Sequence, residues 1–388
     1  MLNYMIPTHQ TALVRTKSVQ RSKGEPSDLE ARIISAIGVA GPRNVAQIAR
    51  LTGVHQETIR YKIKRRFARL GFRFHAEVDF DRLGLTLHWA TLDFSRAYYE
   101  MGPKVLTALN EVGYLAYFAR LIPQGNYMAL FTLPANTSGQ YEGFLEGLQE
   151  KGILRAFDFT ELSVRRHKVM DPRFFNFRSG RWEIEWAKIP AAQAAPLVSG
   201  KKPKVEDFDY SDLLVIKELQ KDALQHLTEI ARKMKIHQKT LEYHYRTHVQ
   251  KWKLIPSYRI RWAQDITKRP IHSTVFTRLA FHHLTRSELS AVQAAISKVP
   301  LLWTEELLQN GTYVAMMYIP LTDMVNVSNY VSNAVPDLGS KVEMSFIDFT
   351  NASSFTIPYN MYRNGDWGFD VRQMATALRK HSIITIEK

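Results

Sequence analysis

Two distant segments carry polar side chains at spacings that could contact a nucleic acid. In each, apolar residues recur at three- and four-residue steps and leave the opposite helical face polar. The outward set is Gln56, Glu57, Arg60, Tyr61 and Lys64 in the first segment, and Gln238, Lys239, Glu242, Tyr243 and Arg246 in the second. Amide and guanidinium groups can pair with base edges in the major groove. We therefore expect both faces to contact DNA, and the alternative is a merely solvated face.

Positive charge surrounds the first of these faces. The chain has 388 residues with 52 Lys and Arg against 37 Asp and Glu, which gives a net charge of +15. An excess of this size favours a polyanionic partner, either nucleic acid or an anionic membrane. We expect Arg65, Arg66, Arg69 and Lys233 to contact phosphates, which would add affinity and salt dependence without specificity. Arg73, in the alternating segment after the third helix, is also expected to contact DNA.

Other candidate chemistry finds less support. His244 and His248 lie four residues apart on one helix, but no third metal ligand is evident, and Lys62 and Arg66 stand at the corresponding places of the first segment. The pair His282-His283 lacks partners in the same way. Cysteine is absent, and neither a phosphate-binding loop nor a nucleophile with its base is visible. We therefore expect no catalytic residues, no metal, no cofactor and no enzymatic activity.

The elements that position the two polar faces form a helix-turn-helix pattern. An apolar-periodic helix begins near Leu29, Asn44 caps a second helix, and a turn at Gly53 leads into a third helix that starts near His55. Alternating segments follow each third helix, at 72–80 and 254–262, and suit the strands of a wing.

The chain repeats itself. Ser27-Asp28-Leu29 recurs as Ser211-Asp212-Leu213, and His55-Gln56 recurs as His237-Gln238. Further matches follow in the same order as far as the ends of the two halves, which predicts a tandem duplication. The two sheets of the halves are then expected to pack on each other as a pseudo-dimer within one chain.

The rest of each half has the order strand, helix, strand, strand, helix, strand, which is typical of a ferredoxin-like sandwich and gives an α+β fold class. The predicted domains are a basic flexible arm at 1–26, a winged helix-turn-helix at 27–84, a ferredoxin-like domain with an aromatic extension at 85–186, a linker at 187–207, a second winged helix-turn-helix at 208–265, a second ferredoxin-like domain with an aromatic extension at 266–370, and a C-terminal helix and tail at 371–388.

Several motifs resemble those of archaeal Lrp/AsnC-type transcription regulators. They are Ile48-Ala49, Gly53-Val54, the run from Thr58 to Arg65, Val78-Asp79 and Leu83-Gly84. The resemblance implies a winged helix-turn-helix joined to a ferredoxin-like domain used for dimerisation and, in many members, for binding an effector. This chain departs from the family in carrying His55 and His237 where a serine cap is usual, one extra residue in the third helix, and two modules in one chain.

We expect a sequence-specific regulator that binds double-stranded DNA with two non-equivalent recognition helices, because Arg60 of the first face becomes Glu242 in the second. The alternatives are an architectural DNA-binding protein of low specificity and a haem-binding decarboxylase of the same family. A homodimer through the ferredoxin-like domains and an unidentified small-molecule effector are possible partners. No apolar run is long enough to span a membrane, so we expect a cytoplasmic, nucleoid-associated protein.

Overall fold

The computed structural model describes residues 26–189, 197, 200, 202–262, 274–335 and 338–383. Except for its last residue, the predicted basic arm at 1–26 lies outside this range, as do parts of the predicted linker and of the C-terminal tail. Within the described residues, no helix combines the length and the apolar character needed to cross a bilayer.

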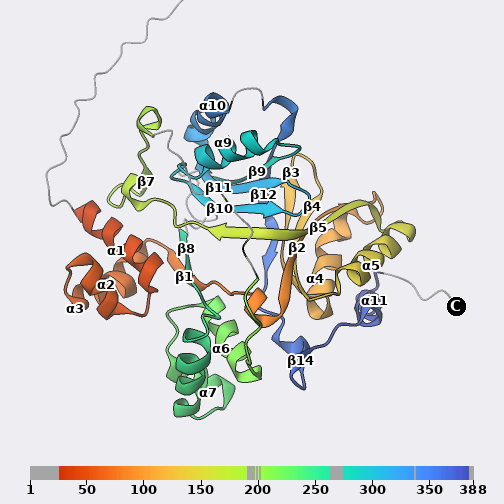
Figure 1. Cartoon of the computed structure of the whole chain (residues 1–388), viewed down its shortest axis with the longest axis horizontal. Helices are drawn as coiled ribbons and strands as arrows, with labels where there is room; N and C mark the ends of the chain where they lie inside the picture. Colours follow the sequence, from red (N-terminus) through yellow and green to blue (C-terminus); the bar gives the residue numbers. More distant parts are fainter. Residues whose placement is uncertain are drawn as a thin grey trace, which may run out of the picture.

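Each half of the chain begins with a module of three helices (Figure 1). The first module contains α1 (Pro26–Ala40), α2 (Val45–Thr52) and α3 (Gln56–Tyr61), which continues as the π-helical turn η1 (Lys62–Phe67). The second contains α6 (Tyr210–Lys221), α7 (Leu227–Met234) and α8 (Gln238–Tyr243), which continues as η6 (His244–Gln250). A π-helical turn holds more residues than an α-helical turn, so it can absorb the extra residue noted in the third helix.

The helix starts follow local capping rules. The Asn44 side chain accepts the backbone N–H of Gln47 at the start of α2. His55 and His237, at the places where serine is usual, use Nδ1 to accept the N–H two residues on, at 3.3 Å in both modules. The imidazoles therefore serve as helix caps.

The expected wings are wrong. The strands β1 (Phe72–Ala76) and β8 (Tyr258–Trp262) pair with each other in an antiparallel ribbon, with Phe74 opposite Ile260. Pairing across the two modules buries the apolar face of each strand against the first helical module. A wing hairpin would require each strand to pair within its own module, whereas this ribbon joins the modules to each other.

The two sheets contact each other, as expected, but they are not separate sandwiches. The first half contributes β2 (Leu85–Phe94), β3 (Leu115–Ile122), β4 (Tyr127–Pro134) and β5 (Leu154–His167), and the second contributes β9 (Thr274–Phe281), β10 (Leu302–Leu308), β11 (Tyr313–Pro320) and β12 (Val342–Ser354). Antiparallel pairing of β5 with β10 and of β3 with β12 closes all eight strands into one barrel. The edges of both sheets are thereby paired within the chain.

Helices cover the outside of this barrel. On the first half these are α4 (Gly102–Val112) and α5 (Ser138–Glu150), with the C-terminal helix α11 (Val371–Lys380) packed on α4, and on the second half they are α9 (Arg286–Ile296) and α10 (Met324–Ala334) (Figure 1). The interior holds a separate core that includes Trp89, Leu130 and Met316. The mixed α/β character and the expected element order are thus confirmed.

Short elements complete the chain. Two hairpins, β6 (Phe175–Asn176) with β7 (Arg181–Trp182) and β13 (Tyr362–Arg363) with β14 (Asp366–Trp367), lie in the predicted aromatic extensions. The Phe175 ring lies edge-on to Trp262 of the ribbon, and the Trp182 ring is tilted against it. The Trp367 indole donates to the Leu83 carbonyl. The extensions therefore cover the core. Single 3-10 turns span Asp81–Leu83, Tyr99–Met101, Pro172–Phe174, Trp186–Lys188, Leu321–Asp323, Gly339–Lys341 and Tyr359–Met361.

Candidate active site

The residues expected to contact DNA lie on the outer faces of the third helices and of the helical turns that continue them, one set on each module, except Arg73, which lies in β1, and Lys233, which lies in α7. All of them are exposed except Arg66 and Glu242, which are half-buried. Arg60 pairs with Glu57 on its own helix, and Gln238 donates to Glu242 at 2.9 Å. Contact of these side chains with DNA stays a prediction, which the fold does not test.

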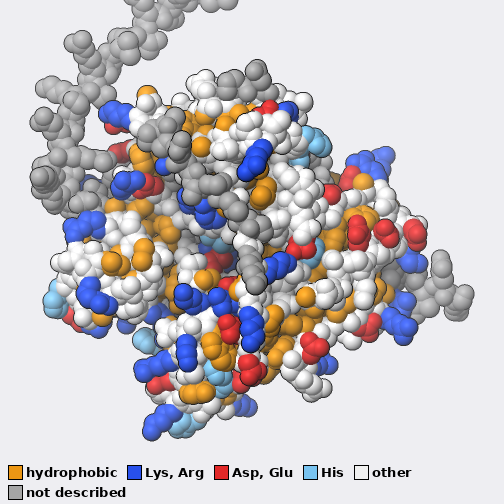
Figure 2. Space-filling model, in the orientation of Figure 1, with side chains coloured by type: hydrophobic (Ala, Val, Ile, Leu, Met, Phe, Trp, Pro, Cys, Tyr) orange, Lys and Arg blue, Asp and Glu red, His pale blue; other side chains and the backbone are white. Residues whose placement is uncertain are grey.

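Some of the basic side chains of the first module form ion pairs within that module. Lys62 Nζ lies 2.6 Å from Glu30 Oε1, and Arg66 Nε lies 3.5 Å from the same oxygen, while Glu30 itself is buried. Figure 2 shows Lys and Arg side chains over both helical modules with acidic side chains among them. The basic excess is therefore spread over the surface and partly neutralised, which weakens the case for a single polyanion-binding face.

A second group of ionisable side chains lies where the ribbon β1·β8 meets the barrel. This mouth cluster consists of Glu77, which directly follows β1, Arg259 of β8, and Arg165 and His167 at the end of β5. His167 Nε2 lies 3.0 Å from Glu77 Oε2, and the Arg259 guanidinium pairs with the other oxygen of Glu77. The four side chains come from three separate strand ends and are all at least two-thirds buried.

Burial and charge perturb the pKa values of the mouth cluster. Burial lowers the pKa of His167 to about 4, although the Glu77 carboxylate opposes this, so the imidazole is neutral at pH 7. Burial alone would raise the pKa of Glu77, but the Arg259 guanidinium beside it helps hold that pKa at about 2. An imidazole and a carboxylate with pKa values pushed in this way mark a candidate site for proton transfer.

The cluster continues into the barrel through Arg165. Its Nε lies 2.9 Å from Glu306 Oε1, and the Trp89 indole N–H donates to the other oxygen of this fully buried carboxylate. Burial raises the pKa of Glu306, against the opposing charge of Arg165. The barrel therefore encloses a buried carboxylate paired with a guanidinium beside an apolar core.

Aromatic side chains form the wall next to the cluster. The His167 ring lies edge-on to Trp303 at 5.7 Å, and Trp303 in turn contacts Phe276, which stacks on Tyr318 at 4.4 Å. Tyr318 also lines an apolar cavity of about 30 Å³ that reaches Trp262 of the ribbon. Flat apolar walls next to charged groups suit a planar ligand that carries charged substituents.

Several buried polar atoms at this site have no hydrogen-bond partner among the described residues. The Nδ1 atom of His167 and the hydroxyl of Tyr117 are buried and make no hydrogen bond to any described residue. A buried polar group without a partner costs roughly 1–3 kcal/mol. Such a cost is typical of groups that await a ligand or a bound water.

Sequence reasoning missed this site. The last strand of the first half extends to His167 in the structure, which brings Arg165 and His167 to the mouth cluster. Glu77 and Arg259 lie in the segments that were expected to form wings. The run Arg165-Arg166-His167-Lys168 was the available signal.

Comparisons with known proteins give a fold relationship. The sequence matches no family model and no curated protein. The structure resembles that of the siroheme decarboxylase NirDL, with a TM-score of 0.54 and 11% identity over 92% of this chain and 99% of that chain. The same decarboxylase in co-complex with an iron-uroporphyrin III analogue matches with a TM-score of 0.51 and 11% identity, over 91% of this chain and 98% of that chain.

This similarity overturns the expectation of a DNA-binding transcription regulator without enzymatic activity. A solved structure that aligns over 92% of this chain is that of an enzyme. The helix-turn-helix pattern was read correctly as a local structure, but a local structure does not by itself establish a function.

Proposed function

We propose that this chain is a decarboxylase that acts on a carboxylated tetrapyrrole of the siroheme type, with the mouth cluster as its active site. The observation that carries the proposal is the neutral, buried His167 beside Glu77, flanked by Arg165 and Arg259. The fold shared with a siroheme decarboxylase supports it.

Decarboxylation requires one proton for each carboxyl group lost. The bond between the carboxylate carbon and the adjacent side-chain carbon breaks, CO₂ leaves, and the electron pair that remains on carbon takes up a proton. His167 is the proton donor in this proposal. Anionic carboxylates of the substrate would raise the pKa of His167 above its value of about 4, because a nearby negative charge favours imidazolium.

The guanidinium groups would position the substrate. Arg165 and Arg259 can each bind a carboxylate through two parallel hydrogen bonds, and both already pair with a carboxylate, that of Glu306 and that of Glu77 respectively. Substrate carboxylates would replace or share these partners. The Trp303 and Tyr318 rings would contact the face of the macrocycle and exclude water from the reacting group.

Entry of the substrate requires movement. The cavity of about 30 Å³ beside the cluster is far smaller than a typical ligand pocket of roughly 300–1,000 Å³. We expect the ribbon β1·β8 to move away from the barrel on binding, which hydrogen exchange of its backbone amides with and without iron-uroporphyrin III would detect.

Siroheme incubated anaerobically with the purified full chain tests the activity, with products followed by mass spectrometry for successive losses of CO₂. His167→Gln should lower the rate by about 10²–10⁴-fold, the usual contribution of a general acid. His75→Gln is the matched control, because His75 is also a histidine of the ribbon region whose pKa burial lowers, and it should keep the wild-type rate. Bound siroheme that remains intact, or equal rates for His167→Gln and wild type, would contradict the proposal.

The architecture also supports a finer proposal about origin. The two halves share the order of their elements and collinear sequence matches, so we propose that they arose by tandem duplication of one Lrp-like module. A homodimer through the ferredoxin-like domains stays a prediction, and it would need a surface other than the sheet edges, which pair within the chain.

A further inference from the structure

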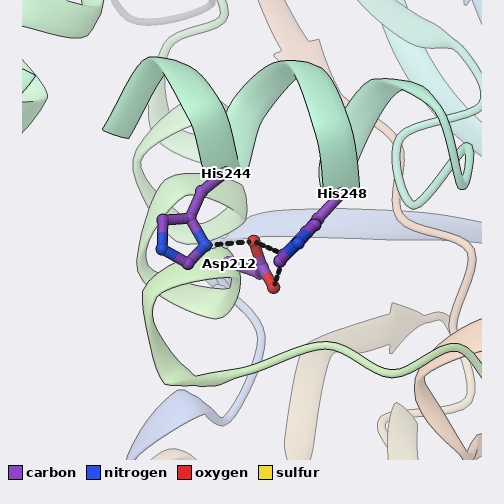
Figure 3. A group of neighbouring side chains, drawn as sticks. All are labelled: Asp212, His244 and His248. Atoms are coloured by element: carbon purple, nitrogen blue, oxygen red, sulfur yellow. Dashed lines mark hydrogen bonds and ion pairs between the residues drawn. The ribbon is translucent and has the colours of Figure 1, made fainter. Parts of the chain in front are cut away.

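Three potential metal ligands converge in the second helical module, away from the mouth cluster. They are Asp212 of α6 and His244 and His248 of η6 (Figure 3). His244 Nδ1 lies 3.0 Å from Asp212 Oδ1, and His248 Nδ1 lies 2.9 Å from Asp212 Oδ2. The structure thus supplies the third ligand that the sequence did not reveal.

Neighbouring groups hold each of these side chains in place. Four-residue spacing puts the two histidines on one helical face, toward α6. Asp212 Oδ2 also accepts the backbone N–H of Asp209 in the capping box of α6. The His248 ring stacks on Trp252, with centroids 4.2 Å apart. Outer contacts of this kind orient ligands before an ion binds.

The donor atoms and their spacing suit a transition metal. Two imidazole nitrogens and a carboxylate oxygen are ligands that zinc takes, at roughly 2.0–2.2 Å and with tetrahedral geometry, which separates neighbouring donors by about 3.3 Å. Asp212 Oδ1 lies 3.0 Å from His244 Nδ1 and 3.1 Å from His248 Nδ1, and the three ligand atoms all lie within 4.8 Å of one another. An ion between them therefore requires each imidazole to move away from the carboxylate by only a few tenths of an ångström. Asp209 Oδ1, on an exposed side chain, lies 3.6 Å from His244 Nδ1 and adds a second carboxylate near the cluster.

The charges around the buried acid differ between the two modules, and this difference favours a cation in the second module. At the corresponding place, the buried Glu30 lies against two permanent cations, Lys62 and Arg66. In the second module the buried Asp212 faces two imidazoles instead, and imidazoles bind metals in their neutral form. A divalent cation on Asp212 would give this cluster the same net charge as its counterpart.

We propose that Asp212, His244 and His248 bind one divalent transition-metal ion of the zinc class, with a position left for water. The ion links α6 to η6, the connection that Lys62 and Arg66 make to Glu30 in the first module. It fastens the third helix of the second module to its first helix.

Titration of the full chain with Co²⁺, followed by its visible absorption, and competition with Zn²⁺ test the proposal. We expect one ion per chain and a melting temperature that rises with Zn²⁺. The double variant His244→Lys with His248→Arg installs the residues of the first module and should fold while losing the ion. The matched control His282→Gln with His283→Gln removes the other adjacent histidines and should bind as wild type does.

A second variant keeps the test valid if the double variant fails to fold, as judged by circular dichroism. Asp212→Asn keeps the shape of the side chain and removes its charge, and it should weaken Co²⁺ binding by more than about tenfold, the smallest loss expected when even an outer contact of a metal ligand is removed. Absence of one-to-one binding in the wild type would overturn the proposal. So would binding that survives at Asp212→Asn but is lost in the 282–283 control.

Discussion

Replacing His167 with glutamine should flatten the pH dependence of stability on the acid side of neutrality. Burial lowers the native pKa of His167 to about 4 from an ordinary value of 6.5. Between these values the unfolded chain binds a proton that the native state does not, so stability falls as the pH falls. One pH unit within this window is worth about 1.4 kcal/mol, and integration from pH 8 to pH 5 gives a loss of about 2 kcal/mol from this one residue.

Urea unfolding of both proteins at pH 5, 6.5 and 8 measures this loss, because the free energy of unfolding extrapolates linearly to zero urea. Burial also lowers the pKa values of His75, His88 and His282, but these residues are present in both proteins and their contributions cancel. Glu77 affects stability between its ordinary pKa of 4.5 and its native pKa of about 2, which is below the lowest pH measured. The reasoning would be refuted if the free energies of unfolding of the two proteins differed by the same amount, within about 0.5 kcal/mol, at pH 8 and at pH 5.

Three further changes test a buried ion pair, a tight glycine contact and a helix cap. Arg165→Met removes the ion-pair partner of the buried Glu306 carboxylate and should lower the free energy of unfolding by about 3–5 kcal/mol. Arg165→Met combined with Glu306→Gln should restore most of this loss, and equal losses in the single and double variants would show that the ion pair is not the cause. Gly41→Ala places a Cβ 2.6 Å from the Tyr258 ring at φ +78° and should lower the melting temperature measured by circular dichroism, whereas an unchanged value would contradict the clash. Thr285→Ala removes the cap of α9 and should cost about 1 kcal/mol in urea unfolding, while Thr285→Ser should not.

The sequence alone determined the local structure of this protein. The apolar spacing, the Asn44 cap and the turn at Gly53 predicted the helical module, and the structure has the expected helices there. The order of strands and helices in each half was also predictable. These features depend on residues close together in the chain, whose preferences act within one or two turns or strands.

The tertiary structure decided the sites. The sequence repeat aligns Asp28 with Asp212, yet the contacts make Glu30 the counterpart of Asp212, because Glu30 is the acid that meets the third helix. The position of an acid against another helix depends on how the two helices pack, and no local pattern records this.

The mouth cluster depends on the tertiary structure in the same way. The extension of β5 to His167 depends on its pairing with β10, where His167 lies opposite Thr304 of the other half. Glu77 reaches His167 only because β1 pairs with β8 and not with a strand of its own module. Strand pairing between distant segments is selected by the burial of whole faces and edges, which is a property of the folded chain and not of any short segment.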